Sequence, residues 1–291
     1  MAASSAMPSS RFFRAPVVPF DTELALIAAG NVSFIEPIDP AIVFVAADDA
    51  PRDPRYALIR DDLRIDGRDA ARRVLAHLAW RSPGPAVPSQ RVVIVESAER
   101  ADALAPLLEK AGLRRTSLTF FAVQAAELAR GATLELDPLF GDEAWRAWST
   151  VEREILAEAI APEPLSDAHL DRSVEFKRKQ QRETPPIRRF IARRDGAPVA
   201  MIGYAPFGTC DMGIGAPGTL VRLRDVAVVA RARRQGLGLS LLRAIAARAI
   251  DECGASQVLI CGESEGPGAA LYLRAGARRL GECAMFRGEP R

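Results

Sequence analysis

The chain has 291 residues, of which 48% are hydrophobic and 26% charged, and its formal net charge is +2. This length supports two domains, and no stretch approaches the roughly 18 consecutive apolar residues that a membrane span requires. The small net charge gives no general affinity for nucleic acid. Four cysteines without a C-x-x-C pair predict reduced thiols of a cytoplasmic protein and argue against a zinc site. Alanine is abundant and nearly all basic residues are arginines, which is typical of a high-GC bacterial gene.

The part of the chain before residue 140 predicts a smaller α/β domain. Residues 1–20 are expected to be a flexible leader, because three prolines interrupt the amphipathic helix that a transit peptide would need. A domain over residues 21–140 follows, and alternation, helical periodicity and Gly/Pro breaks outline its elements. The expected strands are 41–46, 56–60, 91–96 and 115–123, and the expected helices are 68–80 and 98–111.

Residues 141–291 predict a second domain with a different order of elements. The expected helices are 142–160, 166–182, 239–253 and a short one near 268–276, and the expected strands are 187–193, 198–205, 220–228, 257–262 and 281–286. Gly213 to Gly218 matches G-x-G-x-x-G letter for letter. A dinucleotide-binding loop must open a helix, whereas this one leads into a strand. We therefore expect a turn between two strands there.

The segment from Arg233 to Gly238 predicts an anion site. It joins the apolar strand that ends at Val228 to the helix over 239–253. The first amide groups of a helix have no intrahelical acceptor, and the helix dipole places positive charge at the same end. Gly236 and Gly238 lack a Cβ and so leave room for a diphosphate, and the neighbouring arginines add positive charge.

A second motif follows about thirty residues later. Gly268, Leu271, Tyr272, Gly276 and Ala277 match the pattern A-x-x-L-Y-x-x-x-G-F, with Gly in place of Ala and Ala in place of Phe. Together with the R/Q-x-x-G-x-G/A pattern at Arg233, this chain resembles the GNAT superfamily of N-acetyltransferases. Glu265 stands where that family often has Asn.

The resemblance implies an α/β (α+β) GNAT fold: a mixed, mostly antiparallel sheet whose central strands splay apart, flanked by helices. It implies an acyltransferase of the N-acetyltransferase type that uses acetyl-CoA, without a metal, and passes the acetyl group to an amine by direct attack. Tyr272 matches the family tyrosine that acts as general acid. The residues that match the cofactor-binding positions are Val226, Ala227, Val228, Arg233, Arg234, Gln235, Gly236, Leu237, Gly238, Leu239 and Ser240.

The first half of the chain contains a segment similar to the second motif. Residues 107–113 parallel residues 271–277, but Leu108 takes the place of Tyr272 and no phosphate motif precedes it. We therefore interpret residues 21–140 as a GNAT-like domain without the cofactor motif, and residues 141–291 as the catalytic domain.

The sequence leaves the acceptor and the base open. An amine-bearing small molecule or a peptide is the expected acceptor, and a homodimer is allowed. Glu263 and Glu265 are the candidate bases, and strand alternation places Asp225 on the opposite pleat from Arg222 and Arg224. The first two helices of the second domain also carry acids, which are either a site for a cationic acceptor or a solvated face: Glu152, Glu154, Glu158, Asp171 and Glu175. The alternatives in function are a non-catalytic acyl-CoA-binding regulatory module and a transferase for another acyl-CoA.

Overall fold

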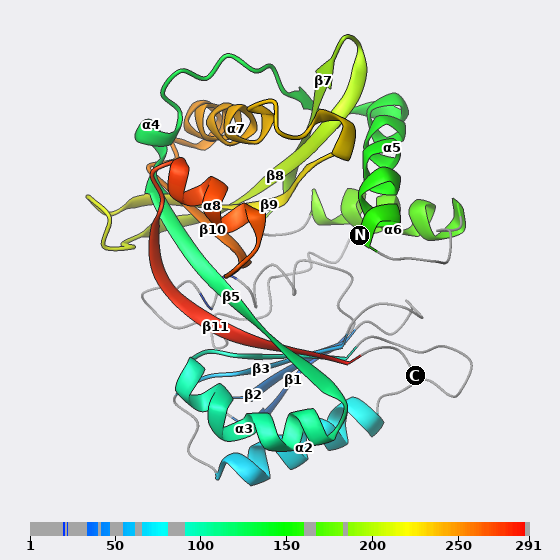
Figure 1. The fold of residues 1–291 in the computed structure, drawn as a ribbon, viewed down its shortest axis with the longest axis vertical. Helices are drawn as coiled ribbons and strands as arrows, with labels where there is room; N and C mark the ends of the chain where they lie inside the picture. Colours follow the sequence, from blue (N-terminus) through cyan, green and yellow to red (C-terminus); the bar gives the residue numbers. More distant parts are fainter. Residues whose placement is uncertain are drawn as a thin grey trace, which may run out of the picture.

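The computed structural model describes Phe20, Thr22 and residues 34–39, 42–46, 55–61, 66–80, 91–159, 167–182 and 186–288. Its strands form one 11-stranded sheet in the order β1-β2-β3-β4-β11-β5-β10-β9-β8-β7-β6 (Figure 1). Among the pairings of these described strands, only β3 with β4 and β9 with β10 are parallel. The predicted fold class, a mostly antiparallel sheet flanked by helices, is therefore confirmed. The predicted leader, apart from Phe20, lies outside the described residues.

The strands agree closely with those expected from the sequence, with β1 and the two-residue β6 in addition. They are β1 (Phe34–Asp39), β2 (Ile42–Ala46), β3 (Arg55–Ile59), β4 (Arg91–Val95), β5 (Leu113–Gln124), β6 (Asp137–Pro138), β7 (Arg188–Arg194), β8 (Ala197–Cys210), β9 (Gly218–Val228), β10 (Gln257–Glu263) and β11 (Arg278–Gly288). Residues 211–217 connect β8 to its antiparallel neighbour β9, which confirms the turn predicted for the G-x-G-x-x-G stretch.

All the predicted helices are present, and the short α4 was not foreseen. They are α2 (Gly67–Trp80), α3 (Ala98–Lys110), α4 (Ala125–Leu128), α5 (Gly141–Ala159), α6 (Asp167–Gln180), α7 (Leu237–Cys253) and α8 (Pro267–Arg274), with a 3₁₀ turn at Ala230–Ala232. In the described ranges, no helix combines the length and the apolar composition needed to cross a membrane.

Strands β5 and β11 join the two halves of the chain. They run antiparallel from the pair Leu113 and Gly288 to the pair Ala122 and Arg278. Strand β5 also pairs with β10, and β11 also pairs with β4, so each half of the sheet is completed by a strand from the other half. Figure 1 shows the two long strands crossing the middle of the molecule side by side. The domain boundary at residue 140 stays a prediction within this continuous sheet.

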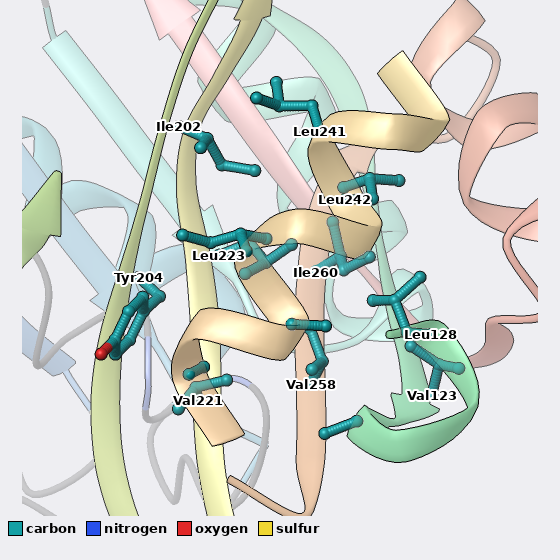
Figure 2. Packing of buried hydrophobic residues seen from close by; sticks show 14 of the residues in the cluster. Val123, Leu128, Ile202, Tyr204, Val221, Leu223, Leu241, Leu242, Val258 and Ile260 are labelled. Atoms are coloured by element: carbon teal, nitrogen blue, oxygen red, sulfur yellow. The ribbon is translucent and has the colours of Figure 1, made fainter. Parts of the chain in front are cut away.

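The largest core lies between the sheet and helices α7, α8 and α4. Leu241, Leu242 and Ile245 of α7 are fully buried against side chains of β8, β9, β10 and β5 (Figure 2). Helix α5 covers the opposite face, where Trp145 and Trp148 pack against the buried residues Ile191 of β7 and Val199 and Met201 of β8. Apolar residues at steps of three and four on α5 and α7 explain why each helix buries one face. The sheet is thus enclosed on both sides in this half.

The N-terminal half has its own core. Helices α2 and α3 pack against β3, β4 and β11 through small and branched side chains, among them Val74, Val93 and Leu104. Strands β3 and β4 stay paired over their whole length, from Arg55 and Arg91 to Ile59 and Val95. This complete parallel ladder distinguishes the half from its C-terminal counterpart.

Candidate active site

The candidate active site begins at a gap between two parallel strands. Strands β9 and β10 pair only from Leu220 with Gln257 to Arg222 with Leu259. Beyond this point β9 continues to Val228 and β10 to Glu263, and among the described strands each is paired only with its outer neighbour, β8 and β5 respectively. A parallel ladder that stops halfway leaves main-chain groups of both strands facing the gap. The predicted cofactor residues Val226 to Val228 lie on this unpaired part of β9.

A β-bulge turns β9 at the start of the gap. Arg224 lies opposite Gly203 and Ala227 opposite Met201, so β9 has one more residue than β8 in this interval. Asp225 takes the extra position with φ 55°, a left-handed conformation in which Asp is tolerated better than most residues. The bulge breaks the strand alternation, so the expectation that Asp225 lies on the opposite pleat from Arg222 and Arg224 is wrong.

Asp225 is held by a buried arginine on β7. Arg189 Nε donates to Asp225 Oδ2 at 2.7 Å, and the Arg189 side chain is 1% exposed. Burial alone would raise the pKa of the Asp225 carboxyl, but the charges of Arg189, Arg224 and Lys177 outweigh it and lower the pKa to about 2. Asp225 therefore stays a paired carboxylate at neutral pH, which makes it a poor general base.

The loop before α7, residues 233–238, is called the anion loop below. It carries a series of main-chain amides without an acceptor in the described structure. Gly236, with φ 79°, forms the N-cap of α7 without a side-chain cap. In the part of the chain that the structure describes, the main-chain N–H groups of residues 234–238 have no protein acceptor, and the next two amides, of Leu239 and Ser240, donate to the Gly236 carbonyl. Five successive free donors at the positive end of a helix are suited to a phosphate group.

The two glycines of this loop are favoured for different structural reasons. A Cβ on Gly236 would meet nothing within 4 Å, but the positive φ favours glycine. A Cβ on Gly238 would lie 3.0 Å from Leu271 Cδ2, so Gly238 allows α7 to pack closely against α8. The sequence interpretation assigned both to the approach of phosphate, and the second assignment misses this packing role.

The arginines of the loop are mostly bound to α5. Arg231 pairs with Glu154 at 3.1 Å, and Arg233 pairs with Glu158 at 2.7 Å. Arg233 Nε also donates to the Val228 carbonyl at 2.8 Å, which joins the loop to the end of β9. Arg234 is exposed, and within the described ranges its side chain makes no ion pair.

The remaining predicted cofactor residues lie on the same loop and on the first turn of α7. The Gln235 side chain accepts a hydrogen bond from Arg194 and donates to the Arg231 carbonyl at 3.3 Å. Leu237 packs partly into the core, and Ser240 Oγ donates to the Gly236 carbonyl at 3.4 Å.

Tyr272 lies on α8 beside the gap. The residue is 7% exposed, and its ring meets that of Phe121 on β5 edge to face, with centroids 5.4 Å apart. Burial raises the pKa of the phenol, so the hydroxyl is protonated at neutral pH. Among the described residues, none hydrogen-bonds this hydroxyl. Tyr272 is thus a protonated donor whose hydroxyl has no acceptor in the described part of the chain.

Two glycines that the sequence did not single out for this role make room for the tyrosine. A Cβ on Gly262 would lie 3.0 Å from Tyr272 Cε2, and a Cβ on Gly268 would lie 3.2 Å from its hydroxyl oxygen. Gly268 is the position at which the motif usually has Ala, and here its missing methyl group leaves space beside the hydroxyl.

A cavity of about 320 Å³ opens next to Tyr272. Its walls come from both halves of the chain: Tyr56, Ile94, Leu118, Arg222, Leu223, Arg224, Asp225, Val226, Ile260, Cys261, Tyr272, Met285 and Arg287. The sequence could not have linked these residues, because five of them lie on the N-terminal half's strands or on β11. Strand pairing alone brings them to the gap.

The candidate bases Glu263 and Glu265 lie elsewhere. Both are exposed and line a second cavity, of about 700 Å³, together with Arg115, Arg279 and Glu282. Tyr272 is not among the residues around that cavity. Neither glutamate is among the residues that line the cavity beside Tyr272.

Acids of α5 expected either at the acceptor site or on a solvated face prove to be structural. Glu152 is buried and accepts hydrogen bonds from Trp148 at 3.0 Å, Ser173 at 2.7 Å and Lys177 at 2.5 Å. Its neighbours on α5, Glu154 and Glu158, are the ion-pair partners of the loop arginines. These carboxylates join α5 to α6 and to the anion loop.

The comparison with protein families is specific to the second half. Residues 145–277 match the model of the acetyltransferase (GNAT) family. Residues 145–277 are a GNAT-family domain. The match includes the split strand pair, the anion loop and Tyr272. GNAT membership supports acyl transfer as the general activity and acyl-CoA with an acceptor as the general ligands.

Solved structures show the same fold over nearly the whole chain. A functionally unknown conserved protein from Staphylococcus epidermidis is 14% identical with a TM-score of 0.64, covering 90% of this chain and 95% of that one. A GCN5-related N-acetyltransferase from Kribbella flavida is 16% identical with a TM-score of 0.54, covering 94% and 95%.

A third structure bears on the organisation of the halves. A tandem GNAT protein from the clavulanic acid biosynthesis pathway is 15% identical with a TM-score of 0.54, covering 85% of this chain and 78% of that one. At these identities the likeness concerns the fold alone. A search of curated proteins found no match to the chain.

The N-terminal half repeats the arrangement of the GNAT domain without its gap. Helix α3 and strand β5 meet at Gly112 (φ 82°), as α8 and β11 meet at Gly276 (φ 85°). The counterparts of β9 and β10 are β3 and β4, whose parallel ladder is complete. Asp61, just after β3, also bonds to Glu96 and Ser97 at the end of β4. No comparable opening exists between these two strands.

Proposed function

We propose that the GNAT domain transfers an acetyl group from acetyl-CoA to an amine by direct attack. The observation that carries this proposal is the gap between β9 and β10, which has the free amides of residues 234–238 at one end and the Tyr272 hydroxyl at its side. A ligand with a diphosphate at one end and a thioester at the other suits both groups.

The proposed cofactor contacts follow the chain. The amides of residues 234–238 and the Arg234 side chain would bind the pyrophosphate, because the helix end and the cation both favour anions. The main chain of Val226 to Val228 would bond the pantetheine arm along the unpaired edge of β9. Main-chain recognition requires no polar side chain, which is consistent with the apolar residues at these positions.

The reaction joins nitrogen to carbon and breaks a carbon–sulfur bond. The lone pair of a neutral amine attacks the thioester carbonyl carbon, and the thiolate of CoA departs. Tyr272 donates its hydroxyl proton to that thiolate, a role for which a raised pKa keeps the proton in place until the leaving group forms. No covalent enzyme intermediate is needed.

The proton of the amine has a route that does not require a strong base. Arg222 and Arg224 line the cavity, and positive charge nearby lowers the pKa of a bound ammonium because it disfavours the charged form. A larger fraction of the acceptor is then neutral, and its second proton leaves to water after attack. This route needs no base from the cavity. Asp225, the carboxylate among the cavity's described lining residues, is already paired with Arg189.

Two measurements test the proposed activity. Calorimetry should detect acetyl-CoA binding to the full chain, with CoA competing, and a thiol-trapping assay with an amine panel should detect CoA release with an acetylated product by mass spectrometry. Succinyl-CoA and longer acyl-CoAs in the same assay define the acyl group. Binding without product for any amine would favour a non-catalytic acyl-CoA module, and absence of binding would contradict the cofactor assignment. We place the reaction in the bacterial cytoplasm, as the cysteine and arginine usage predicts.

A further inference from the structure

The cavity beside Tyr272 is built jointly by the two halves of the chain. Tyr56 of β3, Ile94 of β4 and Leu118 of β5 form one wall with Met285 and Arg287 of β11. The other lining residues lie at the start of the gap between β9 and β10 or on α8. Residues 222–226 of β9 line the cavity, and β9 continues from there to Val228, just before the anion loop. The cavity volume of about 320 Å³ is at the lower end of the range of small-molecule sites, about 300 to 1,000 Å³.

The charges on the cavity wall are mostly positive. Arg222, Arg224 and Arg287 line it, and the carboxylate among its described lining residues is Asp225, which Arg189 already pairs. Arg222 is held in place, since its Nη1 donates to Thr22 Oγ1 at 2.7 Å and its guanidinium lies 5.8 Å from the Phe120 ring centroid. Arginines fixed on one wall favour a ligand with an anionic group.

Arg287 is the arginine most accessible to a ligand. It is exposed on β11, its Nε donates to the Met285 sulfur at 3.2 Å, and within the described ranges it makes no ion pair. The guanidinium presents a planar set of donors that matches a carboxylate with two parallel hydrogen bonds. The neighbouring wall, formed by Ile94, Leu118 and Met285, is apolar.

We propose that the acceptor is a small amine that carries a carboxylate and an apolar body, with its carboxylate bound by Arg287 and its amine next to Tyr272. This rests on the proposed acyl transfer. The apolar wall takes the hydrocarbon part, and the positive wall disfavours polyamines and other cationic acceptors. The N-terminal half, which lacks a gap of its own, thereby contributes apolar wall residues to the acceptor site, while Arg287 comes from β11 of the C-terminal half.

The strand register separates the two groups, because Arg287 pairs with Arg114 whereas Tyr272 contacts Phe121, seven residues along β5. The test therefore compares straight-chain amino acids with terminal amines, such as 6-aminohexanoate and 8-aminooctanoate, with their carboxamides, which keep the amine and the hydrocarbon chain and remove the negative charge. We expect kcat/KM with acetyl-CoA to be higher for these acids than for the matching amides. Arg287→Met keeps the length and apolar contacts of the side chain. It should lower the acid-to-amide ratio of kcat/KM by about 10- to 100-fold, the loss of a charged hydrogen-bond pair. Arg278→Met, an exposed arginine on the same strand that lines neither cavity, should leave the ratio unchanged.

A binding measurement separates this inference from the proposed activity. Calorimetry with 8-aminooctanoate and its carboxamide in the presence of CoA requires no turnover, and thermal melting checks that Arg287→Met is folded. Binding of 8-aminooctanoate that is lost in Arg287→Met supports the carboxylate site even if no acetylated product forms. Acetylation in which amides or polyamines equal the acids, or 8-aminooctanoate binding that Arg287→Met leaves intact, would overturn the inference while the acyl transfer stands.

Discussion

Phe121 and Tyr272 meet edge to face at 5.4 Å, and they come from opposite halves of the chain. Phe121 lies on β5, the strand that the N-terminal half inserts between β10 and β11. Tyr272 lies on α8 of the GNAT domain, beside the gap. The proposed general acid is therefore positioned by a residue more than a hundred positions earlier in the sequence, so the two halves are expected to act as one catalytic unit.

Removal of the Tyr272 hydroxyl should affect turnover and not binding. Tyr272→Phe keeps the ring contact with Phe121, so acetyl-CoA affinity should change little, whereas loss of a general acid should lower kcat by about a hundredfold. Because burial raises the pKa of this phenol, wild-type kcat should not fall through Tyr272 ionisation below about pH 10. Steady-state kinetics on an identified amine across pH measures both.

Tyr204→Phe is the matched control for that variant. Tyr204 is also a buried tyrosine, but its hydroxyl donates to Glu252 at 2.6 Å away from the gap. Its loss should lower the free energy of unfolding by about 1 kcal/mol and leave kcat unchanged. Full activity of Tyr272→Phe at saturating substrate would make Tyr272 a packing residue.

Glycines at the two ends of α7 test the anion site. Gly236 and Gly254 both have positive φ, 79° and 64°, and a Cβ at either meets nothing within 4 Å. Glutamate at either position should cost a similar 1 to 2 kcal/mol of stability. Only Gly236→Glu places a negative charge at the free amides, so only this variant should lose acetyl-CoA binding by calorimetry. Equal affinities of the two folded variants would sink the pyrophosphate assignment.

Asp225, in the bulge of β9, should contribute more to the free energy of unfolding than Asp195, which has a similar backbone conformation in an exposed turn. Asp225→Asn keeps a residue that tolerates the left-handed conformation but leaves the buried Arg189 without its counter-charge, which should cost about 3 kcal/mol in urea unfolding. Asp195 has a similar φ of 51° in the exposed turn between β7 and β8. Asp195→Asn should change the free energy of unfolding by less than about 0.5 kcal/mol.

The same pair predicts a pH dependence. The pKa of Asp225 is about 2 in the folded protein against an ordinary 3.8, so its ionised form is stabilised by folding. The contribution, about 2 kcal/mol, is complete above the ordinary pKa and is lost as the pH falls toward 2. The difference in unfolding free energy between wild type and Asp225→Asn should therefore shrink from pH 5 to pH 3. A constant difference would contradict the assigned ion pair.

Each half contributes one strand to the sheet of the other, since β5 pairs with β10 and β11 pairs with β4. We therefore expect the two halves to depend on each other for folding. A fragment that begins at Ala132 lacks β5, so β10 and β11 lose their shared partner, and a fragment that ends at Gly131 lacks β11. Unpaired strand edges favour aggregation, so each fragment alone should be insoluble. The two fragments expressed together should form a soluble complex that binds acetyl-CoA. A soluble fragment 132–291 with a native melting transition would show that the GNAT domain folds alone.

Much of the GNAT domain could be predicted from the sequence because its signals are local. Apolar periodicity defines α5 and α7, glycines mark the anion loop, and the motif around Tyr272 spans ten residues. Each of these patterns depends on neighbours within a few turns of chain, where propensity and sterics decide the conformation. The family and the fold class followed from them.

Only the tertiary structure decided how these parts meet. The insertion of β5 between β10 and β11 pairs segments about 160 residues apart, and local sequence carries no signal for such a choice of partner. The bulge at Asp225 inverted an expected side-chain direction, because one extra residue shifts the alternation of a strand. Arg287 reached the cavity for the same reason: the position of a side chain near the C-terminus is set by which strands its own strand pairs with, and not by the residues around it in sequence.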